Sequence, residues 1–502
     1  MAGIPSHADP QQILESVFGY REFRPGQRHI IDAVLSGRDC IGVMPTGAGK
    51  SLTFQIPARI LPGTVLVISP LISLMKDQVD ELVRLGFRAA VINSTLDHGE
   101  RRQRLGRLRR GELELVYVAP EGIEGSMGRF IAEAAVSLVV VDEAHCISHW
   151  GHDFRPAYRK LRRLKEELGD IPVLALTATA TRPVVGDIIR QLGMRKPDGF
   201  KGSFFRPNLH ITAQKRGQGR NTRADILGLI RRHDGESGIV YCLGRKGVES
   251  TAAWLRLQGI NAAPYHAGLE PEARTAAQDA FARDEIDVIV ATVAFGMGID
   301  KSNVRFVIHR DMPKSVEAWY QEMGRAGRDG LPSDCILMYS WADVIGYDRF
   351  LAGIEDEAVR TATRRKTVEM FELADRPGCR HQAVTAYLDE RIDPCGGSCD
   401  HCRGAGLEAL VAPVKTIVPR QKAALACSGP ADPALFEKLR TLRKRIADEE
   451  GVPAYIVFSD AVLQQMAAHV PTSRSALLAL SGVGPVKLER YGERFLRILE
   501  EH

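Results

Sequence analysis

The segment Cys40–Ser51, CIGVMPTGAGKS, decides the fold of the first part of this chain. Its apolar start, Cys40–Met44, predicts a buried strand, and a helical pattern follows the glycine-rich turn. Further short apolar runs alternate with helical patterns, which is typical of a parallel sheet covered on both faces. These runs are Thr64–Ser69, Ala89–Ile92, Leu115–Ala119, Leu138–Asp142 and Val173–Thr177.

The same alternation restarts after Asn208 and predicts a second unit of this kind. We therefore expect an α/β protein with two tandem parallel-sheet lobes, residues 1–207 and 208–340. The boundary is expected near 205–225, where Gly, Arg and Asn are frequent. The strands of the second lobe are expected at Ile239–Leu243, Asn261–Tyr265, Val288–Thr292, Arg305–Ile308 and Cys335–Tyr339.

The remainder of the chain has a helical pattern. Residues 341–403 predict a helical subdomain that ends in a cysteine cluster, residues 404–431 a linker, and residues 432–502 a small all-α bundle. The bundle pattern breaks at Ser481–Pro485. This glycine-rich turn could present N–H groups to a backbone phosphate, or it could be a plain turn between two helices.

The composition limits the classes of function. The 502 residues correspond to about three or four domains, and 44% of them are hydrophobic. A net charge of +5 permits a nucleic-acid partner but fits a mildly basic enzyme equally well. The start, MAGIPSHADP, lacks the regions of a signal peptide, and no apolar run is long enough to cross a bilayer. We expect a cytoplasmic, nucleoid-associated protein with no membrane partner.

The turn after the first strand has the residues of a phosphate-binding loop. Gly47 and Gly49 permit a backbone whose N–H groups face phosphate oxygens. Lys50 would place a positive charge on the β- and γ-phosphates, and Ser51 would hold Mg²⁺. Met44 stands where the common pattern has its first glycine. The expected nucleotide-binding residues of this loop are Thr46, Gly47, Ala48, Gly49, Lys50 and Ser51.

A second strand of the first lobe ends in Asp142–His145, DEAH. Carboxylates at the carboxyl end of a parallel strand lie where ligands bind in open α/β sheets. We expect Asp142 to hold Mg²⁺ through water and Glu143 to orient or deprotonate the attacking water. The alternative is an acidic turn on the surface.

The segment Gln321–Gly330, QEMGRAGRDG, offers positive charge from the second lobe. Arg325 and Arg328 are three residues apart, so on a helix they would share a face. Charge on a transferred phosphoryl group requires such a cation in the transition state. We expect Gln321, Arg325 and Arg328 to act in catalysis, and the alternative is a surface helix with salt bridges.

Of nine cysteines, four form the cluster Cys379, Cys395, Cys399 and Cys402. Four thiolates around Zn²⁺ make a closed structural site. The alternatives are free thiols, or His381 or His401 in place of one cysteine. The five scattered cysteines fit a reducing compartment better than a disulfide framework.

Two further segments suggest nucleic-acid contacts. Cys146–Tyr158, CISHWGHDFRPAY, interleaves aromatic and basic residues, which suits base stacking with phosphate contact, although a core helix would also space its aromatics this way. The expected DNA-binding residues are His149, Trp150, His152, Phe154 and Arg155. Arg101–Arg110 holds six arginines and is either the solvated face of an amphipathic helix or a phosphate-contacting patch.

These segments and their order resemble superfamily 2 helicases, and their arrangement resembles that of the RecQ family of DNA helicases. Intermediate segments match as well: SPLISLMKDQV from Ser69, YVAPE from Tyr117, LTATA from Leu176, GIVYCLGR from Gly238 and VIVATVAFGMGID from Val288. The resemblance covers roughly 15–402 and 433–502. It implies that both lobes are RecA-like, that ATP binds between them, and that the loop after DEAH links DNA binding to hydrolysis.

The resemblance also assigns residues that the pattern alone leaves open. Phe18–Gln27, FGYREFRPGQ, is similar to the family's adenine-recognition segment, in which Tyr20 would stack on adenine, Arg24 would support it and Gln27 would bind the base edge. Without the resemblance, Tyr20 and Phe23 could form a hydrophobic staple. Residues 432–502 resemble an HRDC domain, on the strength of YIVFSD from Tyr455 and LSGVGP from Leu480.

The chain departs from the family at two places. Three residues separate Cys395 from Cys399, where the family usually has two. Only thirty residues separate Cys402 from Pro433, too few for the winged-helix domain that RecQ proteins usually carry there.

We therefore expect an ATP-dependent helicase that uses ATP, Mg²⁺ and Zn²⁺, moves 3′ to 5′ on single-stranded DNA and unwinds duplexes in recombination and repair. Its partners would be single-stranded and partially duplex DNA, with a single-strand-binding protein or recombination factors, and it would work as a monomer. The alternatives are a DNA-stimulated ATPase that translocates or anneals but unwinds weakly, an ATP-gated DNA clamp, and an RNA helicase.

Overall fold

The computed structural model describes residues 9–70, 72–93, 96–123, 131, 133–148, 155, 157–158, 161, 165, 168–169, 171–293, 295, 301–351, 353, 356–411 and 432–502. The chain divides into two compact units. Unit 1 comprises Met1–Phe204 with Ser481–Gly492, and unit 2 comprises Phe205–Leu480 with Glu493–His502.

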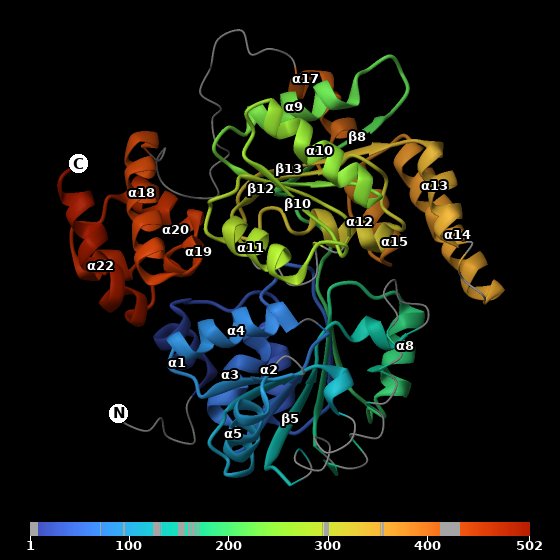
Figure 1. Ribbon diagram of the computed structural model, residues 1–502. Helices are drawn as coiled ribbons and strands as arrows, with labels where there is room; N and C mark the ends of the chain where they lie inside the picture. The colour runs from blue at the N-terminus through green and yellow to red at the C-terminus, as the bar shows by residue number, and fades with distance from the viewer. Residues whose placement is uncertain are drawn as a thin grey trace. The chain divides into compact units, whose positions relative to one another are not determined.

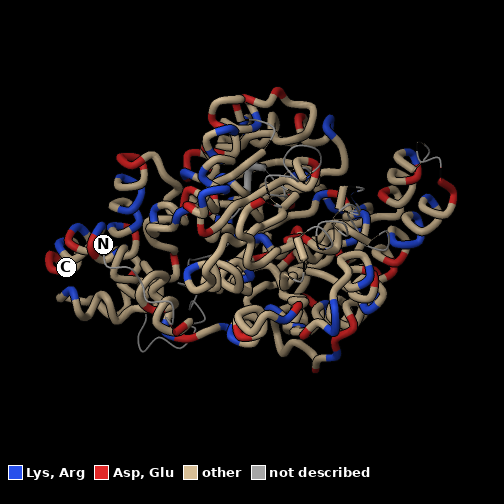
Figure 2. The backbone as a smooth tube through the Cα atoms, turned by 90° about the horizontal axis from the view of Figure 1, so that it is seen from below, with Lys and Arg blue, Asp and Glu red and all other residues tan. Residues whose placement is uncertain are grey.

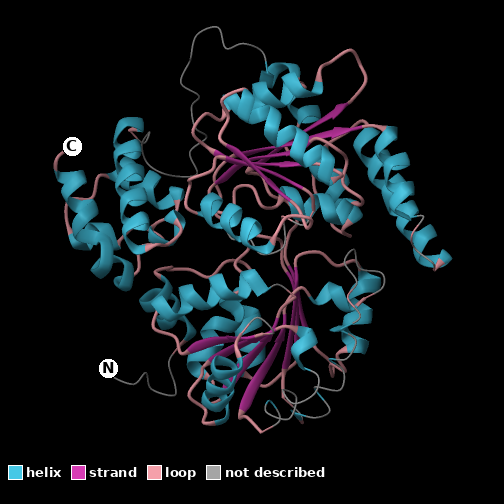
Figure 3. Cartoon of the chain, viewed as in Figure 1, coloured by secondary structure: helices cyan, strands magenta, loops and turns pink. Residues whose placement is uncertain are grey.

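Unit 1 is built on a parallel sheet of seven strands in the order β3-β4-β2-β5-β6-β1-β7. Helices lie outside the sheet (Figure 3). The strands are β1 Cys40–Val43, β2 Thr64–Ile68, β3 Ala89–Ile92, β4 Leu115–Val118, β5 Val136–Val141, β6 Val173–Thr177 and β7 Asp198–Lys201.

The helices of unit 1 cover both faces of this sheet. In Figure 1, α8 lies on the opposite side of the strands from α3 and α4. One core cluster of unit 1 joins apolar residues of α2, α3 and α4 to inward-facing residues of the strands, such as Phe54, Met75 and Val140. The helices are α1 Pro10–Ile13, α2 Gln27–Leu35, α3 Leu52–Ile60, α4 Ile72–Arg84, α5 His98–Arg109 and α8 Arg182–Gln191.

Unit 2 is built on a second parallel sheet, of six strands in the order β10-β11-β9-β12-β13-β8. The strands are β8 Leu209–Lys215, β9 Ser237–Tyr241, β10 Ala262–Tyr265, β11 Val288–Ala291, β12 Val304–His309 and β13 Ser333–Tyr339. The helices that alternate with them are α9 Thr222–Arg232, α10 Arg245–Leu257, α11 Pro271–Ala282 and α12 Val316–Met323.

The prediction of two parallel α/β lobes is confirmed, and each predicted strand is present with its ends shifted by at most two residues. Two edge strands were not predicted. β7 alternates between intermediate and exposed residues, so it has no apolar run. β8 lies inside the segment predicted as the boundary between the lobes, and only its alternate residues Leu209 and Ile211 are apolar and buried at its start.

Helices follow the second sheet, as predicted. After β13 come α13 Trp341–Leu351, α14 Glu357–Asp375, α15 Arg380–Tyr387, α16 Asp400–Arg403 and α17 Glu408–Val411. The C-terminal helices are α18 Pro433–Glu450, α19 Ala454–Val457, α20 Asp460–His469, α21 Arg474–Leu478 and α22 Pro485–Glu500. Leu407 and Leu410, within the predicted linker, belong to the core of unit 2. In the described part of the chain, no helix combines the length and apolarity needed to cross a membrane.

The segment with the cysteine cluster covers the free edge of β8. The N–H of Ile211 donates to Ser398 O at 2.9 Å, and the N–H of Ala213 donates to the carboxylate of Asp400 at 3.0 Å. The His381 ring bonds to Leu209 O at 3.0 Å. These bonds occupy backbone groups that an exposed edge strand would leave open to pairing with other chains.

Candidate active site and metal centre

The loop between β1 and α3 has the backbone that a phosphate-binding loop requires. Gly47 and Gly49 have φ of 85° and 76°, a conformation that favours glycine. A Cβ at Gly49 would lie 2.5 Å from Nε2 of Gln27. The Lys50 ammonium donates to Met44 O at 3.3 Å, so the lysine folds back over the loop.

The predicted adenine-recognition segment is tied to this loop by hydrogen bonds. The Arg24 guanidinium donates to Gly47 O, and the Gln27 amide donates to Gly49 O at 2.8 Å. The Oε1 of Gln27 accepts from the Arg24 N–H at 2.8 Å. Tyr20 is 39% exposed, so its ring is accessible for stacking. Because both ends of the Gln27 amide are bonded, reading an adenine edge would require it to exchange a partner.

Asp142 and Glu143 stand at the carboxyl end of β5. The Asp142 N–H donates to Ile68 O at 2.9 Å, and its carbonyl accepts from the Tyr158 hydroxyl at 3.0 Å. Desolvation, followed by the charge of Glu143, raises the pKa of Asp142 to about 7, against the opposing effect of Lys50. A divalent cation would stabilise the charged form of such a carboxylate, so Asp142 fits the predicted Mg²⁺ ligand.

Glu143 has φ of 48°, which is uncommon for a residue other than glycine and typical of functional sites. Its Oε2 lies 3.3 Å from Nδ1 of His145. Within the described part of the chain, this buried oxygen has no hydrogen-bond partner. It therefore has a free lone pair for a water molecule, as the predicted role requires.

Thr177, at the end of β6, joins the two phosphate-binding segments. Its carbonyl accepts from the N–H of Met44 at 2.9 Å, and its hydroxyl bonds to Nδ1 of His145 at 2.9 Å. A second link runs from α4, where the Gln78 amide donates to the Ser51 hydroxyl at 3.2 Å. Sequence analysis assigned neither residue a role, although both lie in segments quoted for the resemblance, LTATA and SPLISLMKDQV.

Arg325 and Arg328 do not share a helix, and this prediction is wrong. α12 ends at Met323, and glycines break the helical pattern beyond it, with φ of 56° at Gly327 and 87° at Gly330. Both arginines lie in the turns that follow. Gln321 lies on α12 and is half-buried.

The neighbourhood of Arg325 is polar and buried. The Glu322 carboxylate bonds to Nε2 of His309 at 2.9 Å, and the His309 ring stacks on Tyr241 with 5.2 Å between centroids. Burial raises the pKa of the Tyr241 hydroxyl, and Arg325 is the charge that most opposes this shift. Arg325 is 9% exposed, whereas Arg328 is half-buried.

Most of the predicted DNA-binding loop lies outside the described residues: His149, Trp150, His152 and Phe154. Arg155 is described, and its guanidinium donates to Pro70 O at 3.1 Å. Tyr158, which shares the aromatic spacing, is fully buried beneath Asp142. For Tyr158 the spacing therefore reflects core packing.

The four clustered cysteines fit Zn²⁺. Their Sγ atoms lie within 4.8 Å of one another. Among the described residues, these four cysteines form the cluster of side chains that could hold a metal ion. The N–H of Cys395 donates to Cys379 Sγ at 3.3 Å, and that of Cys402 to Cys399 Sγ at 3.4 Å, as suits thiolates. Although burial opposes it, hydrogen bonds from Ser398 and the Gly397 backbone lower the pKa of Cys395 to about 6.

The extra residue between Cys395 and Cys399 is accommodated by glycines. Gly396 and Gly397 have φ of 71° and 148°, and a Cβ at either would meet nothing within 4 Å. The alternative ligand His381 is bonded to β8, and His401 is not in the cluster.

The arginine-rich helix α5 behaves as a solvated amphipathic helix. Leu105 and Leu108 are buried. Four arginines of this segment form ion pairs: Arg104 with Glu100, Arg107 and Arg110 with Glu112, and Arg109 with Glu133. Basic and acidic residues also intermingle along the backbone in Figure 2.

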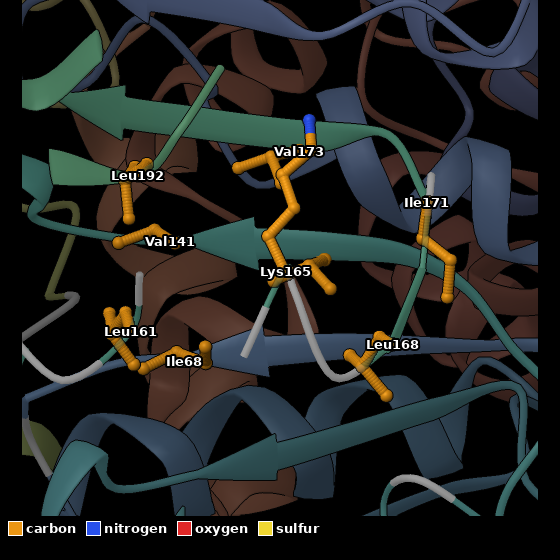
Figure 4. Close-up of a pocket in the computed structure, with 9 residues that line it drawn as sticks. Ile68, Val141, Leu161, Lys165, Leu168, Ile171, Val173 and Leu192 are labelled. Carbon is orange, nitrogen blue, oxygen red and sulfur yellow. The ribbon is translucent and has the colours of Figure 1, made fainter. Parts of the chain in front are cut away.

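In two other features of the chain, a group that could meet a phosphate is already bonded within the protein. The N–H of Gly482, in the Ser481–Pro485 turn, donates to Gly19 O at 3.2 Å and so is already used. An apolar pocket of unit 1 is lined by Lys165 and eight apolar residues, seven of which are labelled in Figure 4. The Lys165 ammonium pairs with Asp39 at 2.5 Å, so no free charge lines this pocket.

Four protein-family models match segments of this chain. The model of the DEAD/DEAH box helicase matches residues 24–188, and that of the helicase conserved C-terminal domain matches 221–330. RecQ zinc-binding matches 341–403, and the HRDC domain matches 432–499.

The chain is also similar to individual helicases. The ATP-dependent DNA helicase RecQ of Pasteurella multocida is 36% identical over 601 positions, covering 99% of this chain and 95% of the relative. That of Bacillus subtilis is 35% identical, covering 98% of each. The solved helicase MrfA bound to DNA has a TM-score of 0.55 at 17% identity, covering 74% of this chain and 57% of that one. The last likeness concerns the fold alone.

The fold and the site thus define an ATP-hydrolysing helicase with two parallel-sheet lobes. The chain belongs to the RecQ family of ATP-dependent DNA helicases. The predicted family, its helicase activity on DNA and its use of ATP, Mg²⁺ and Zn²⁺ are confirmed.

The zinc site yields a test. Replacing Cys399, which is fully buried, by serine should remove zinc, which is expected at about one ion per chain in the unaltered protein. The midpoint of thermal unfolding should fall, because the segment covering β8 loses its anchor. Metal analysis and thermal unfolding measure both effects. Cys335→Ala, at a buried thiol outside the cluster, is the control and should keep zinc. Full zinc content in Cys399→Ser would contradict the assignment.

Proposed function

We propose that this chain moves 3′ to 5′ along single-stranded DNA and unwinds duplex DNA in recombination and repair. The observation that carries the motor assignment is the link through Thr177, which holds the phosphate-binding loop and the DEAH segment at one edge of one sheet. Polarity and pathway rest on membership of the RecQ family.

Each group of residues would have a separate role. Tyr20, Arg24 and Gln27 bind adenine, residues 46–51 hold the phosphates, and Ser51 and Asp142 hold Mg²⁺. That ion would supply charge stabilisation at the phosphates. Glu143 positions water or takes its proton. Gln321, Arg325 and Arg328 of the second lobe contact the phosphoryl group that is transferred, and Arg328 provides the principal positive charge.

DNA would bind through the loop after DEAH, at His149, Trp150, His152, Phe154 and Arg155. This loop begins next to Glu143 in sequence, so a DNA contact can act on the water-positioning residue. We propose the domain limits 1–207, 208–340, 341–403, 404–431 and 432–502. We also propose that the protein works as a monomer at the nucleoid in the cytoplasm, alongside single-strand-binding or recombination proteins.

A second candidate is a DNA-stimulated ATPase that translocates or anneals but unwinds weakly. The observation that favours it is the small number of residues between the matched zinc-binding segment, which ends at 403, and the matched HRDC segment, which begins at 432. A winged-helix domain does not fit in this interval.

A pair of tailed duplexes tests the proposal. Strand separation should occur on a duplex with a 3′ single-stranded tail and not on one with a 5′ tail, with ATP turnover stimulated by DNA. Lys50→Ala should lower turnover by about a hundredfold or more, because the β- and γ-phosphates lose their cation. Turnover that is indifferent to DNA would contradict the motor assignment, and DNA-stimulated turnover without strand separation would favour the second candidate.

The DNA-binding loop needs a test of its own. Trp150→Ala should lower the stimulation of ATP turnover by single-stranded DNA by about tenfold, since base stacking contributes about 1–3 kcal/mol per base. ATP binding, measured with a fluorescent analogue, should not change. Trp341→Ala, which removes a tryptophan that is 46% exposed on α13, is the matched control and should retain stimulation. Equal loss of ATP binding and stimulation in Trp150→Ala would indicate a packing role instead.

A further inference from the structure

Arg206 holds the turn that carries the two catalytic arginines. Its guanidinium donates to Gly324 O at 3.0 Å, to Ala326 O at 3.0 Å and to Gly327 O at 2.6 Å. These carbonyls flank Arg325 on both sides and immediately precede Arg328. One side chain therefore fixes the backbone from which both arginines project.

The turn depends on such support because it lies beyond the end of α12. The last carbonyls of α12 accept from N–H groups of the turn itself, and the carbonyls of the turn need partners from elsewhere. Gly327 is in the left-handed region, and a Cβ there would lie 2.5 Å from the Asn208 amide. Asn208 donates to Gly327 O at 2.9 Å and to Leu331 O at 3.1 Å, but only Arg206 reaches the carbonyls of Gly324 and Ala326 in the described hydrogen bonds.

Arg206 lies at one end of the segment 202–206. At the other end, Gly202 is hydrogen-bonded to β1, the strand that leads into the phosphate-binding loop. β7 pairs with β1 in register, with Val43 opposite Lys201. The N–H of Gly202 donates to Val43 O at 2.8 Å, one residue before the loop begins. From Gly202 to Arg206 the chain can span at most about 14 Å. The division between unit 1 and unit 2 falls within this stretch, at Phe204 and Phe205.

We propose that Arg206 is a positioning residue for ATP hydrolysis, which couples the strand before the phosphate-binding loop to the orientation of Arg325 and Arg328. Its guanidinium suits this role because its planar set of donors can bind several carbonyls at once, which a lysine cannot match. Arg206 contacts neither substrate nor metal in this scheme. The inference rests on the proposed role of Arg328 at the transferred phosphoryl group.

Steady-state ATP turnover with saturating single-stranded DNA tests the inference. Arg206→Gln should lower kcat by about ten- to a hundredfold, since small displacements of a catalytic group cost factors of this size. The KM for ATP should change by less than about threefold, because the residues expected to bind the nucleotide in unit 1 are untouched. Arg206→Lys keeps the charge but loses most of the bonds, so it should show a smaller loss in the same direction. If Arg206→Gln fails to fold, the kcat of Arg206→Lys tests the inference instead.

A double-mutant comparison separates positioning from general stability. On an Arg328→Ala background, Arg206→Gln should lower kcat little further, because residues that act through one another are not additive. Arg104→Gln is the matched control, because the Arg104 guanidinium also donates to a backbone carbonyl, that of Val91, at 2.8 Å, but on α5 of unit 1. It should leave kcat within about threefold.

The outcomes are distinguishable. If Arg328→Ala keeps the unaltered kcat, the proposed role of Arg328 fails and the inference falls with it. If Arg328→Ala lowers kcat but folded Arg206→Gln and Arg206→Lys do not, the inference alone is overturned. It is also overturned if the full loss from Arg206→Gln persists on the Arg328→Ala background, or if Arg104→Gln reproduces it.

Discussion

The hydrogen bonds of Thr177 are the constraint on which the first lobe's chemistry depends. β6 lies between β1 and β5 in the sheet, and its last residue bonds to both neighbours' extensions, at Met44 and at His145. Parallel strands bring their carboxyl ends to one edge, so this pair of bonds holds the loop after β1 close to the DEAH segment after β5. Lys50 and Asp142 are close enough for the lysine to oppose the rise in the carboxyl pKa.

In the second unit, side-chain hydrogen bonds to backbone carbonyls hold the turn that carries the proposed catalytic arginines. Arg325 and Arg328 stand on turns whose carbonyls are held by Arg206 and Asn208, residues that precede the edge strand β8. The cysteine cluster in turn covers β8 through Ile211 and Ala213. Zinc held by these four cysteines would stabilise the segment that covers β8, the strand that follows Arg206 and Asn208.

Much of this could be predicted from the sequence, for identifiable reasons. Buried strands such as β3 and β6 are continuous apolar runs, and the phosphate-binding loop and DEAH follow such strands directly. The edge strands β7 and β8 were missed because one-sided burial leaves only weak alternation. Arg325 and Arg328 were expected on a helix because their spacing was considered without the glycines at 324, 327 and 330. The parts played by Thr177 and Arg206 depend on contacts with residues far away in sequence, which no local pattern reveals.

Within the first lobe, the residues proposed to bind the nucleotide differ from Glu143, the residue proposed to position the attacking water. Measuring ATP affinity and DNA-stimulated turnover of Glu143→Gln tests it most directly, because the amide keeps the shape of the side chain but cannot take a proton. The account predicts an ATP Kd within about threefold of the unaltered protein and a turnover lowered by about a hundredfold or more. Turnover close to that of the unaltered protein, or a loss of ATP binding that matches the loss of turnover, would contradict it.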